Sequence, residues 1–119
     1  MSGKKVLITG STGFIGKHLV QLFIEKDYEV IGICQTKQNS PHIRRHISGN
    51  TDWSDLLIDV DVIVHCAAAV HSMDSSGDSF KIYEEMNLNA TLNLANQAKS
   101  NVKRFIFLST IKVNGDETF

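Results

Sequence analysis

The stretch Val6-Leu-Ile-Thr-Gly-Ser-Thr-Gly-Phe-Ile-Gly16 joins a short apolar run to three regularly spaced glycines. The run Val6-Leu7-Ile8 is typical of a strand that is buried on both faces of a sheet. Helical spacing of apolar residues begins at Phe14, so the glycines lie between a strand and a helix.

The three glycines predict a cradle for a phosphate group. Gly10 allows a sharp turn, Gly13 lets the backbone approach a pyrophosphate that a Cβ would displace, and Gly16 lets the helix pack close to the sheet. The free N–H groups at the start of the helix would face the anion. The alternative is a purely structural turn, because three glycines alone are weak evidence. Their place between a strand and a helix favours a nucleotide site.

Strand and helix patterns alternate along the rest of the chain. One helix is expected from Phe14 to the polar residues 25–27, and a longer one over 79–100. Further strands are expected over 29–34, 46–49, 61–66 and 104–109. A short helix, capped at residues 51–52, is expected to end at Leu57. This alternation predicts an α/β fold with a doubly wound parallel sheet of order 3-2-1-4-5. Its ligand should lie at the carboxyl ends of strands one and four.

Length and composition limit the class of protein. The chain has 119 residues, enough for one domain with its own core. Its 13 acidic residues nearly balance its 12 basic residues, which argues against a nucleic-acid surface or a polybasic membrane tail. The first residues resemble neither a signal peptide nor a membrane span, so a cytoplasmic protein is expected. Cys34 and Cys66 end strands that should lie roughly 10 Å apart, so reduced thiols are expected.

The end of the second predicted strand bears on the choice of cofactor. Dinucleotide sites that prefer NAD place Asp or Glu there to bind the ribose 2′-hydroxyl. This chain has Cys34 followed by Gln35. Gln35 could bind a hydroxyl, and Lys37, Arg44 or Arg45 could reach a 2′-phosphate. Alternatively, these are ordinary residues of a surface loop. Both NAD and NADP therefore stay open as cofactors.

The segment Thr9-Gly-Ser-Thr-Gly-Phe-Ile-Gly16 resembles the signature of the extended short-chain dehydrogenase/reductase family, the group of nucleotide-sugar epimerases and dehydratases. The resemblance implies a Rossmann-like domain that binds NAD or NADP. The cofactor contacts that it implies in this half of the chain come from Gly10, Thr12, Gly13, Phe14, Ile15, Gly16, Cys34 and Gln35.

Two loop segments carry the same resemblance. The stretch Gly49-Asn-Thr-Asp52 resembles the segment after the third strand, where Asn50 and Thr51 would meet the adenine; a plain turn with an Asp cap is the alternative. The stretch His65-Cys-Ala-Ala-Ala69 resembles a His-x-Ala-Ala segment whose small residues, Ala67, Ala68 and Ala69, line the cofactor. His65 itself is interpreted as a core histidine with hydrogen-bond partners. The histidines and cysteines lack metal-ligand spacing, so no metal is expected.

The long helix and the strand after it complete the resemblance. The stretch Asn87-Leu-Asn-Ala-Thr91 resembles an Asn-x-x-Gly-Thr helix, which implies that Asn87 braces the strand ends beside the cofactor. Ser109-Thr-Ile-Lys-Val-Asn-Gly115 resembles a Ser-Ser-x-x-Val-Tyr-Gly segment, with Asn114 in place of Tyr. Thr110 falls on the position of the catalytic Ser/Thr, whose hydroxyl hydrogen-bonds the substrate oxygen that gains or loses a proton.

The family's chemistry also needs a Tyr-x-x-x-Lys pair on the following helix, where the Lys lowers the pKa of the Tyr. Neither Tyr28 nor Tyr83 has Lys four residues later. Residues 1–119 are therefore expected to be the N-terminal, cofactor-binding portion of a longer protein, truncated after strand five. That strand would then present a bare apolar edge, which predicts self-association into a homo-oligomer.

The resemblance implies a function for the parent protein. It would oxidise a nucleotide-linked sugar transiently to a keto-sugar and reduce it again, as UDP-sugar 4-epimerases do. A nucleotide-sugar dehydratase and an NADP-dependent carbonyl reductase of the same family are alternatives. A dinucleotide-binding sensor or interaction module without catalysis is a third.

Overall fold

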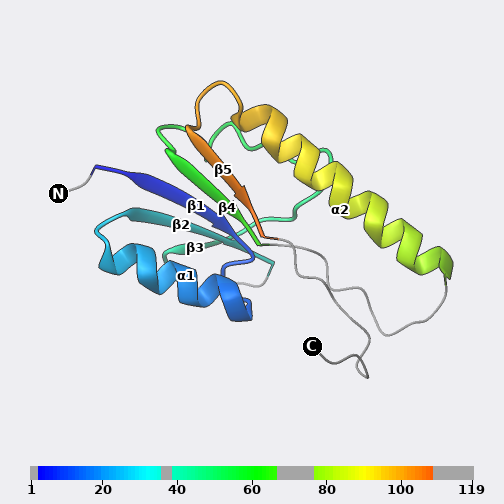
Figure 1. The fold of residues 1–119 in the computed structure, drawn as a ribbon, viewed down its shortest axis with the longest axis horizontal. Helices are drawn as coiled ribbons and strands as arrows, with labels where there is room; N and C mark the ends of the chain where they lie inside the picture. Colours follow the sequence, from blue (N-terminus) through cyan, green and yellow to red (C-terminus); the bar gives the residue numbers. More distant parts are fainter. Residues whose placement is uncertain (1–2, 36–38, 67–76, 109–119) are drawn as a thin grey trace.

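The computed structural model describes residues 3–35, 39–66 and 77–108, and between 77 and 84 the backbone alone. Its elements are β1 (Lys5–Thr9), α1 (Phe14–Glu25), β2 (Glu29–Cys34), β3 (His42–Arg44), β4 (Val62–His65), α2 (Gly77–Ala98) and β5 (Arg104–Phe107). The strands form one parallel sheet of order β3-β2-β1-β4-β5, and their arrows all point the same way in Figure 1. The predicted fold class and strand order are confirmed.

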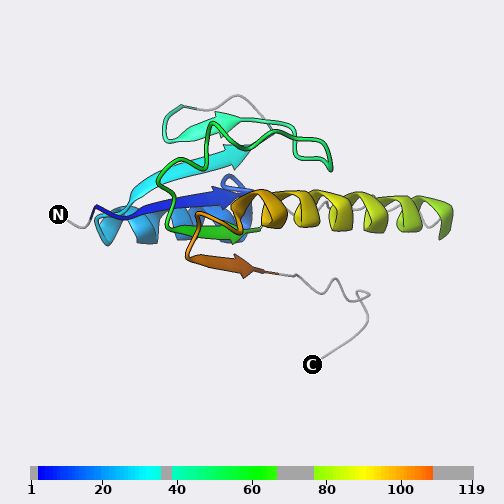
Figure 2. The same ribbon diagram turned by 90° about the horizontal axis from the view of Figure 1, so that it is seen from above.

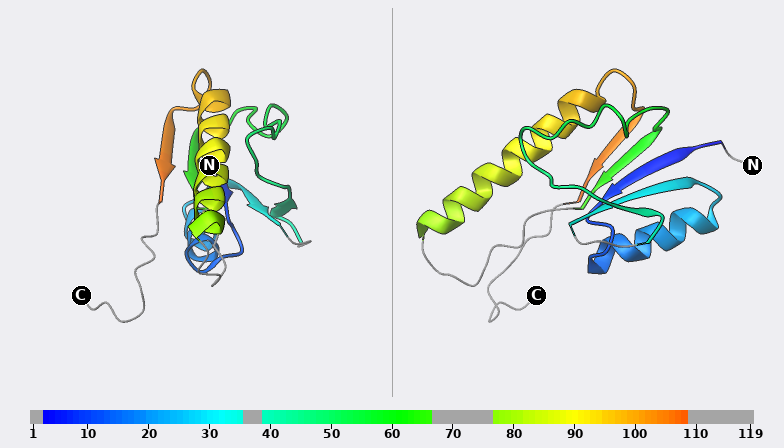
Figure 3. Two further views of the ribbon diagram at one scale, coloured as in Figure 1. Left: turned by 90° about the vertical axis from the view of Figure 1, so that its right-hand side faces the viewer. Right: turned by 180° about the vertical axis from the view of Figure 1, so that it is seen from behind.

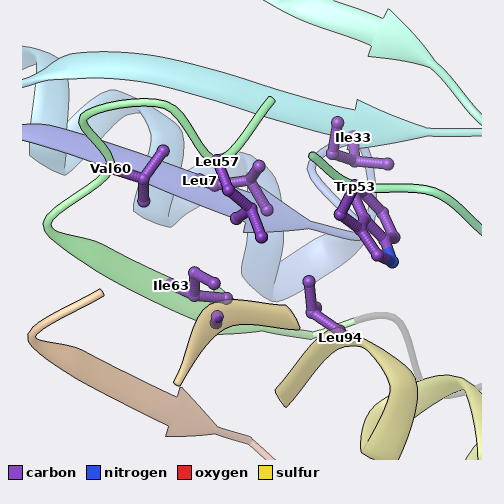
Figure 4. Close-up of a cluster of buried hydrophobic side chains, with 8 residues drawn as sticks. Leu7, Ile33, Trp53, Leu57, Val60, Ile63 and Leu94 are labelled. Atoms are coloured by element: carbon purple, nitrogen blue, oxygen red, sulfur yellow. The ribbon is translucent and has the colours of Figure 1, made fainter. Parts of the chain in front are cut away.

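Each face of the sheet has its own apolar cluster, because alternate side chains of a strand point to opposite faces. On one face, Val6 and Ile8 of β1 pack with Val20 of α1. On the other face, α2 and the loop before β4 cover the sheet. The buried members of this second cluster are Leu7, Ile33, Trp53, Leu57, Val60, Ile63, Leu94 and Ala98 (Figure 4). The two helices thus lie on opposite faces, as in other doubly wound folds.

The helix α2 is the longest element, and it runs past the carboxyl ends of the strands (Figure 2). One face of α2 packs against the sheet, since Ala90, Leu94 and Ala98 are buried. The helix ends where the N–H groups of Asn101 and Val102 bond to the Ala98 carbonyl. A helix in this place overlooks the edge at which a ligand of a doubly wound sheet binds.

Side-chain amides of α2 hold the loop between β3 and β4. The Asn93 amide donates to the carbonyls of Ser48 (3.2 Å) and Thr51 (2.8 Å). The Gln97 amide donates to the Thr51 carbonyl at 2.8 Å, and its oxygen accepts the Trp53 N–H at 2.8 Å. These bonds fix a loop that has little regular secondary structure of its own.

The prediction of a third strand over residues 46–49 is wrong, because the third strand is β3, at residues 42–44. It pairs with the last three residues of β2. Residues 46–49 instead enter a turn, in which the Thr51 hydroxyl accepts the Ser48 N–H at 2.8 Å and donates to the His46 carbonyl at 2.9 Å. Backbone groups that bond within a turn are not free to extend a sheet.

The short helix expected over residues 51–57 is also wrong, because this segment forms a single turn. Asp52 does cap it, since its carboxylate accepts the N–H and the hydroxyl of Ser54 at 3.0 and 2.7 Å. The Leu57 N–H bonds to the carbonyl four residues earlier at 3.0 Å. Asp59 then adopts a φ of 63°, which is incompatible with a longer right-handed helix.

The two edges of the described sheet are β3 and β5, with α2 between them in the left view of Figure 3. On β5, Ile106 and Phe107 are 37% and 49% exposed. The expected apolar edge is therefore present in the described part of the chain. The self-association inferred from it stays a prediction.

Candidate functional site

The glycine turn between β1 and α1 is built around the Gly10 carbonyl. Gly10 has a φ of 67°, a backbone conformation that favours glycine. Its carbonyl accepts the Gly13 N–H at 3.0 Å. A Cβ on Gly16 would lie 2.0 Å from that same oxygen, so α1 begins as close to the turn as a glycine permits. The turn is tight because two later glycines leave room for it.

The N-terminus of α1 has the features of an anion-binding site. Gly13 is the N-cap residue, no side chain caps the helix, and its first turn contains no acidic residue. A Cβ on Gly13 would lie 3.3 Å from the Gly10 carbonyl, so the glycine keeps the space above the turn open. Uncapped N–H groups and the helix dipole both favour a phosphate here. The residues present therefore fit the pyrophosphate of a dinucleotide.

The residues beside this cradle are accessible. Thr12 is exposed, and Phe14 and Ile15 are 78% and 41% exposed. Two exposed apolar side chains at the start of a helix provide contact area for a ligand. Gly16 is buried beside the Gly10 carbonyl, and its lack of a side chain lets α1 begin close to the turn.

At the end of β2, the two predicted contact residues differ in exposure. Cys34 is 3% exposed, and its thiol lies 3.8 Å from the Ile43 carbonyl. Gln35 is exposed. The Ser11 N–H donates to the Ile33 carbonyl at 3.0 Å and so fixes the glycine turn against the end of β2. Gln35 is therefore the residue of the two that offers a polar side chain to a ribose beside the turn.

The basic residues proposed for a 2′-phosphate also differ. The Arg45 guanidinium bonds to both carboxylate oxygens of Asp55, at 2.8 and 3.0 Å, and to the Asp52 carbonyl at 3.0 Å. Its hydrogen bond with Asp55 raises the pKa of Arg45 and lowers the pKa of Asp55. The Arg45 guanidinium is thus used in hydrogen bonds to the loop, whereas the Arg44 side chain is exposed. Lys37 lies outside the described residues.

The segment after β3 presents Asn50 and not the Thr51 side chain. Asn50 is exposed, and its N–H donates to the Ser48 hydroxyl at 3.1 Å. Both the hydroxyl and the carbonyl of Thr51 are used in bonds within the protein. Asn50 therefore has a free surface for an adenine, and Thr51 shapes the loop that carries it.

His65 joins the strands at the switch point to α2. Its Nδ1 atom lies 2.7 Å from the Thr9 hydroxyl, and its Nε2 atom lies 3.0 Å from the Thr91 hydroxyl. The Cys66 N–H donates to the same Thr9 oxygen at 2.9 Å. The ring also stacks on Phe107, with centroids 5.5 Å apart. Burial lowers the pKa of His65 to about 4, so the ring is neutral at pH 7. The interpretation as a satisfied core histidine is confirmed.

Asn87 is half-buried on α2, one helical turn before Thr91. Its place on the face that packs against the sheet agrees with the expected bracing role, which stays a prediction. Ala67, Ala68, Ala69 and Thr110 lie outside the described residues. Cys34 and Cys66 are free thiols, and burial raises the pKa of Cys66.

A feature of the site that sequence reasoning missed is a contact between Ser11 and His42. The Ser11 hydroxyl lies 2.8 Å from His42 Nδ1, although 31 residues separate the two in sequence. One signal could have indicated it. Gly32 stands inside a strand, where glycine often marks a close approach of another segment.

Metal binding and membrane insertion can both be assessed over the described residues. Within these ranges, no three His, Cys, Asp or Glu side chains are grouped so that they could hold a metal ion. Over the same part of the chain, neither helix combines the length and the apolar character needed to cross a membrane.

A parallel, doubly wound sheet with a glycine turn at the end of β1 and an uncapped helix after it defines a Rossmann-like α/β domain. Residues 6–119 match the NAD dependent epimerase/dehydratase family. The chain belongs to this family. The resemblance inferred from the glycine turn is thereby confirmed.

Individual relatives agree with this assignment. The chain is 43% identical to the UDP-glucose 4-epimerase of Vibrio cholerae over 97% of its own length and 37% of that protein. It superposes on the UDP-N-acetylglucosamine 4-epimerase of Bacillus cereus with a TM-score of 0.72 at 25% identity, covering 96% of this chain and 38% of that one. A structure of MoeE5 in complex with UDP-glucose and NAD matches with a TM-score of 0.72 at 28% identity, over 93% of this chain and 38% of that one. The chain thus spans well under half the length of these relatives.

Proposed function

We propose that residues 1–119 form the NAD-binding, N-terminal portion of a nucleotide-sugar epimerase that acts on a UDP-sugar. The observation that carries the proposal is the 43% identity to the Vibrio cholerae UDP-glucose 4-epimerase across 97% of the chain. The glycine turn adds physical support, because its geometry leaves the N-terminus of α1 open to a pyrophosphate. The complex of MoeE5 with UDP-glucose and NAD supports the same pairing of substrate and cofactor.

Each part of the site has a role in this proposal. The N–H groups at the start of α1 bind the pyrophosphate, and Phe14 and Ile15 flank it. Gln35 bonds to the adenosine ribose, and Asn50 bonds to the adenine. The remaining proposed contacts, which rest on the family resemblance, are Ala67, Ala68, Ala69 and Asn87.

The proposed reaction is a transient oxidation of one sugar carbon to a ketone, followed by reduction from the opposite face. A bound NAD would supply the hydride acceptor and donor. Thr110 would hydrogen-bond the sugar oxygen as it loses or regains its proton. In the family's pattern the general base is the Tyr of a Tyr-x-x-x-Lys pair, and residues 1–119 contain no such pair.

Calorimetric titration of the chain with NAD and, separately, NADP tests the cofactor part of the proposal. Saturable binding of NAD is the expected result. A folded chain that binds neither dinucleotide would contradict the claim that these residues form a binding unit by themselves. Dinucleotide binding without turnover of UDP-glucose in a protein of the relatives' length would favour a sensor module instead.

Replacing Thr110 in a protein of the relatives' length tests the catalytic part. Thr110→Ala should lower the turnover number by about 10²–10⁴-fold, since general acid–base groups contribute on that order. Thr110→Ser retains the hydroxyl and serves as the matched control. An Ala variant with the turnover number of the parent would remove Thr110 from the mechanism.

A further inference from the structure

The hydrogen bond between Ser11 and His42 links the glycine turn to an edge strand. Ser11 directly follows Gly10, and His42 is the first residue of β3. Their side chains meet at 2.8 Å between Oγ and Nδ1, across the intervening strand β2. The bond therefore spans three elements: the turn after β1, β2 and β3.

Gly32 makes this contact possible. A Cβ at position 32 would lie 2.7 Å from both Cβ and Oγ of Ser11, and 2.9 Å from His42 Nδ1. His42 is the register partner of Gly32 on the neighbouring strand. The pair thus occupies the space that a side chain at position 32 would otherwise fill.

Ser11 is placed to act on a ligand through the backbone and not by direct contact. Its relative exposure is 0%, so its hydroxyl cannot reach a ligand in solution. Its N–H bonds to the Ile33 carbonyl at 3.0 Å, and its side chain bonds to His42. The next residues, Thr12 and Gly13, are exposed and belong to the anion cradle. Any shift of Ser11 is therefore passed on directly to the cradle.

We propose that Ser11 and His42 are a positioning pair that holds the glycine turn in its binding geometry and so sets the affinity for a dinucleotide pyrophosphate. The inference rests on the proposed function, because it assumes that the turn binds a dinucleotide. Binding groups that are already held in the bound geometry strengthen affinity, because no conformational entropy is lost in ordering them when the ligand binds. Through His42, the strand β3 holds the glycine turn in place, although β3 itself is not part of the anion-binding turn.

The test compares ligand affinity with stability in one set of variants. NAD and ADP are titrated calorimetrically into the unaltered chain, Ser11→Ala, His42→Leu, His42→Asn and the Ser11→Ala/His42→Leu double variant. ADP carries the pyrophosphate and adenosine without the nicotinamide. Urea unfolding without ligand is measured in parallel. His46→Leu, on an exposed histidine of the following loop, is the matched control.

The proposed role of the pair predicts a specific pattern of NAD and ADP affinities among these variants. Ser11→Ala and His42→Leu should each weaken NAD and ADP binding about fivefold to tenfold, as expected for one lost hydrogen bond. The double variant should bind no more weakly than either single variant, because the two residues act as a unit. His42→Asn should restore binding, since its amide can replace Nδ1. If Ser11→Ala fails to fold, the contrast between His42→Leu and His42→Asn decides alone.

Two results would overturn the inference, and they are distinguishable. Variants that lower the urea midpoint but bind NAD and ADP like the unaltered chain would make the pair purely structural, and the proposed function would stand. An unaltered chain that is folded and binds neither NAD nor ADP would overturn the proposed function and this inference with it.

Discussion

His65 Nδ1 lies 2.7 Å from the Thr9 hydroxyl, and this bond joins the carboxyl ends of β4 and β1 at the centre of the sheet. The same ring reaches α2 through Thr91. Because His65 is 1% exposed, the network is shielded from water and its members depend on one another. The switch point of the sheet is thus held by a neutral histidine.

This network predicts that stability falls in mild acid. The folded-state pKa of His65 is about 4, below its ordinary value of 6.5. As the pH falls from 6.5 to 4, the unfolded chain takes up a proton that the folded chain excludes. Up to roughly 3 kcal/mol of stability should be lost in this window, with no further loss from His65 below it. Urea unfolding between pH 7 and 4.5 measures the loss.

His65→Gln should flatten that pH dependence, because Gln can hydrogen-bond without titrating. His18→Gln, which changes an exposed histidine of α1, is the control and should retain the full slope. Equal slopes for His65→Gln and the unaltered chain would show that another group causes the acid sensitivity.

The glycines at 13 and 16 should respond differently to a side chain. A Cβ on Gly16 would lie 2.0 Å from a backbone oxygen, so Gly16→Ala should lower the melting temperature markedly. A Cβ on Gly13 would lie 3.3 Å from that oxygen, so Gly13→Val should keep the circular dichroism spectrum and lose NAD binding. Calorimetry at matched folded concentration separates the two effects. A Gly13→Val chain with normal NAD affinity would contradict the assignment of the cradle.

Cys34→Asp should shift preference toward NAD over NADP, because a carboxylate at the end of β2 can accept a bond from the ribose 2′-hydroxyl and repels a 2′-phosphate. It should also lower stability, since Cys34 is 3% exposed and its Sγ faces the Ile43 carbonyl. The ratio of the two dissociation constants measures the shift. Gln35→Asp, on the exposed neighbour, tests the same preference without the cost of burial.

Trp53 should tolerate loss of its indole nitrogen. Among the described residues, Trp53 Nε1 is the one buried side-chain nitrogen or oxygen without a hydrogen-bond partner, and it is drawn in blue in Figure 4. Trp53→Phe removes this unsatisfied donor, a gain of about 1–3 kcal/mol that offsets the smaller ring. Its free energy of unfolding should stay within about 1 kcal/mol of the original, whereas Trp53→Ala should cost about 3–5 kcal/mol. A large loss for Trp53→Phe would indicate a hidden partner, such as a buried water.

The exposed edge at β5 should promote self-association of this 119-residue chain. Ile106 and Phe107 are 37% and 49% exposed on that edge strand. Light scattering over a concentration series should show dimers or larger species, and Ile106→Lys should reduce them. A monomer at every concentration would contradict the prediction.

The sequence predicted those parts of the structure that depend on local pattern. Glycine spacing located the turn before α1, and the alternation of elements predicted the strand order. The third strand was misplaced because β3 has only three residues and is defined by its pairing with β2. The Ser11–His42 bond depends on that same register, so Gly32 could indicate a close approach there but not which two side chains meet. Likewise, the salt bridge between Arg45 and Asp55 forms because the loop folds back on itself, which no local pattern indicates.

The hydrogen bonds made by the side-chain amides of Asn93 and Gln97 have a consequence for the order in which the chain folds. They join residues that are 42 to 46 positions apart in the sequence. The loop that carries Asn50 therefore gains these hydrogen bonds only after α2 has docked on the sheet. In hydrogen exchange, the Trp53 amide should therefore open together with the C-terminal half of α2, as one cooperative unit. Any ligand or partner that loosens this half of the helix would also release the loop on the adenine side of the proposed site.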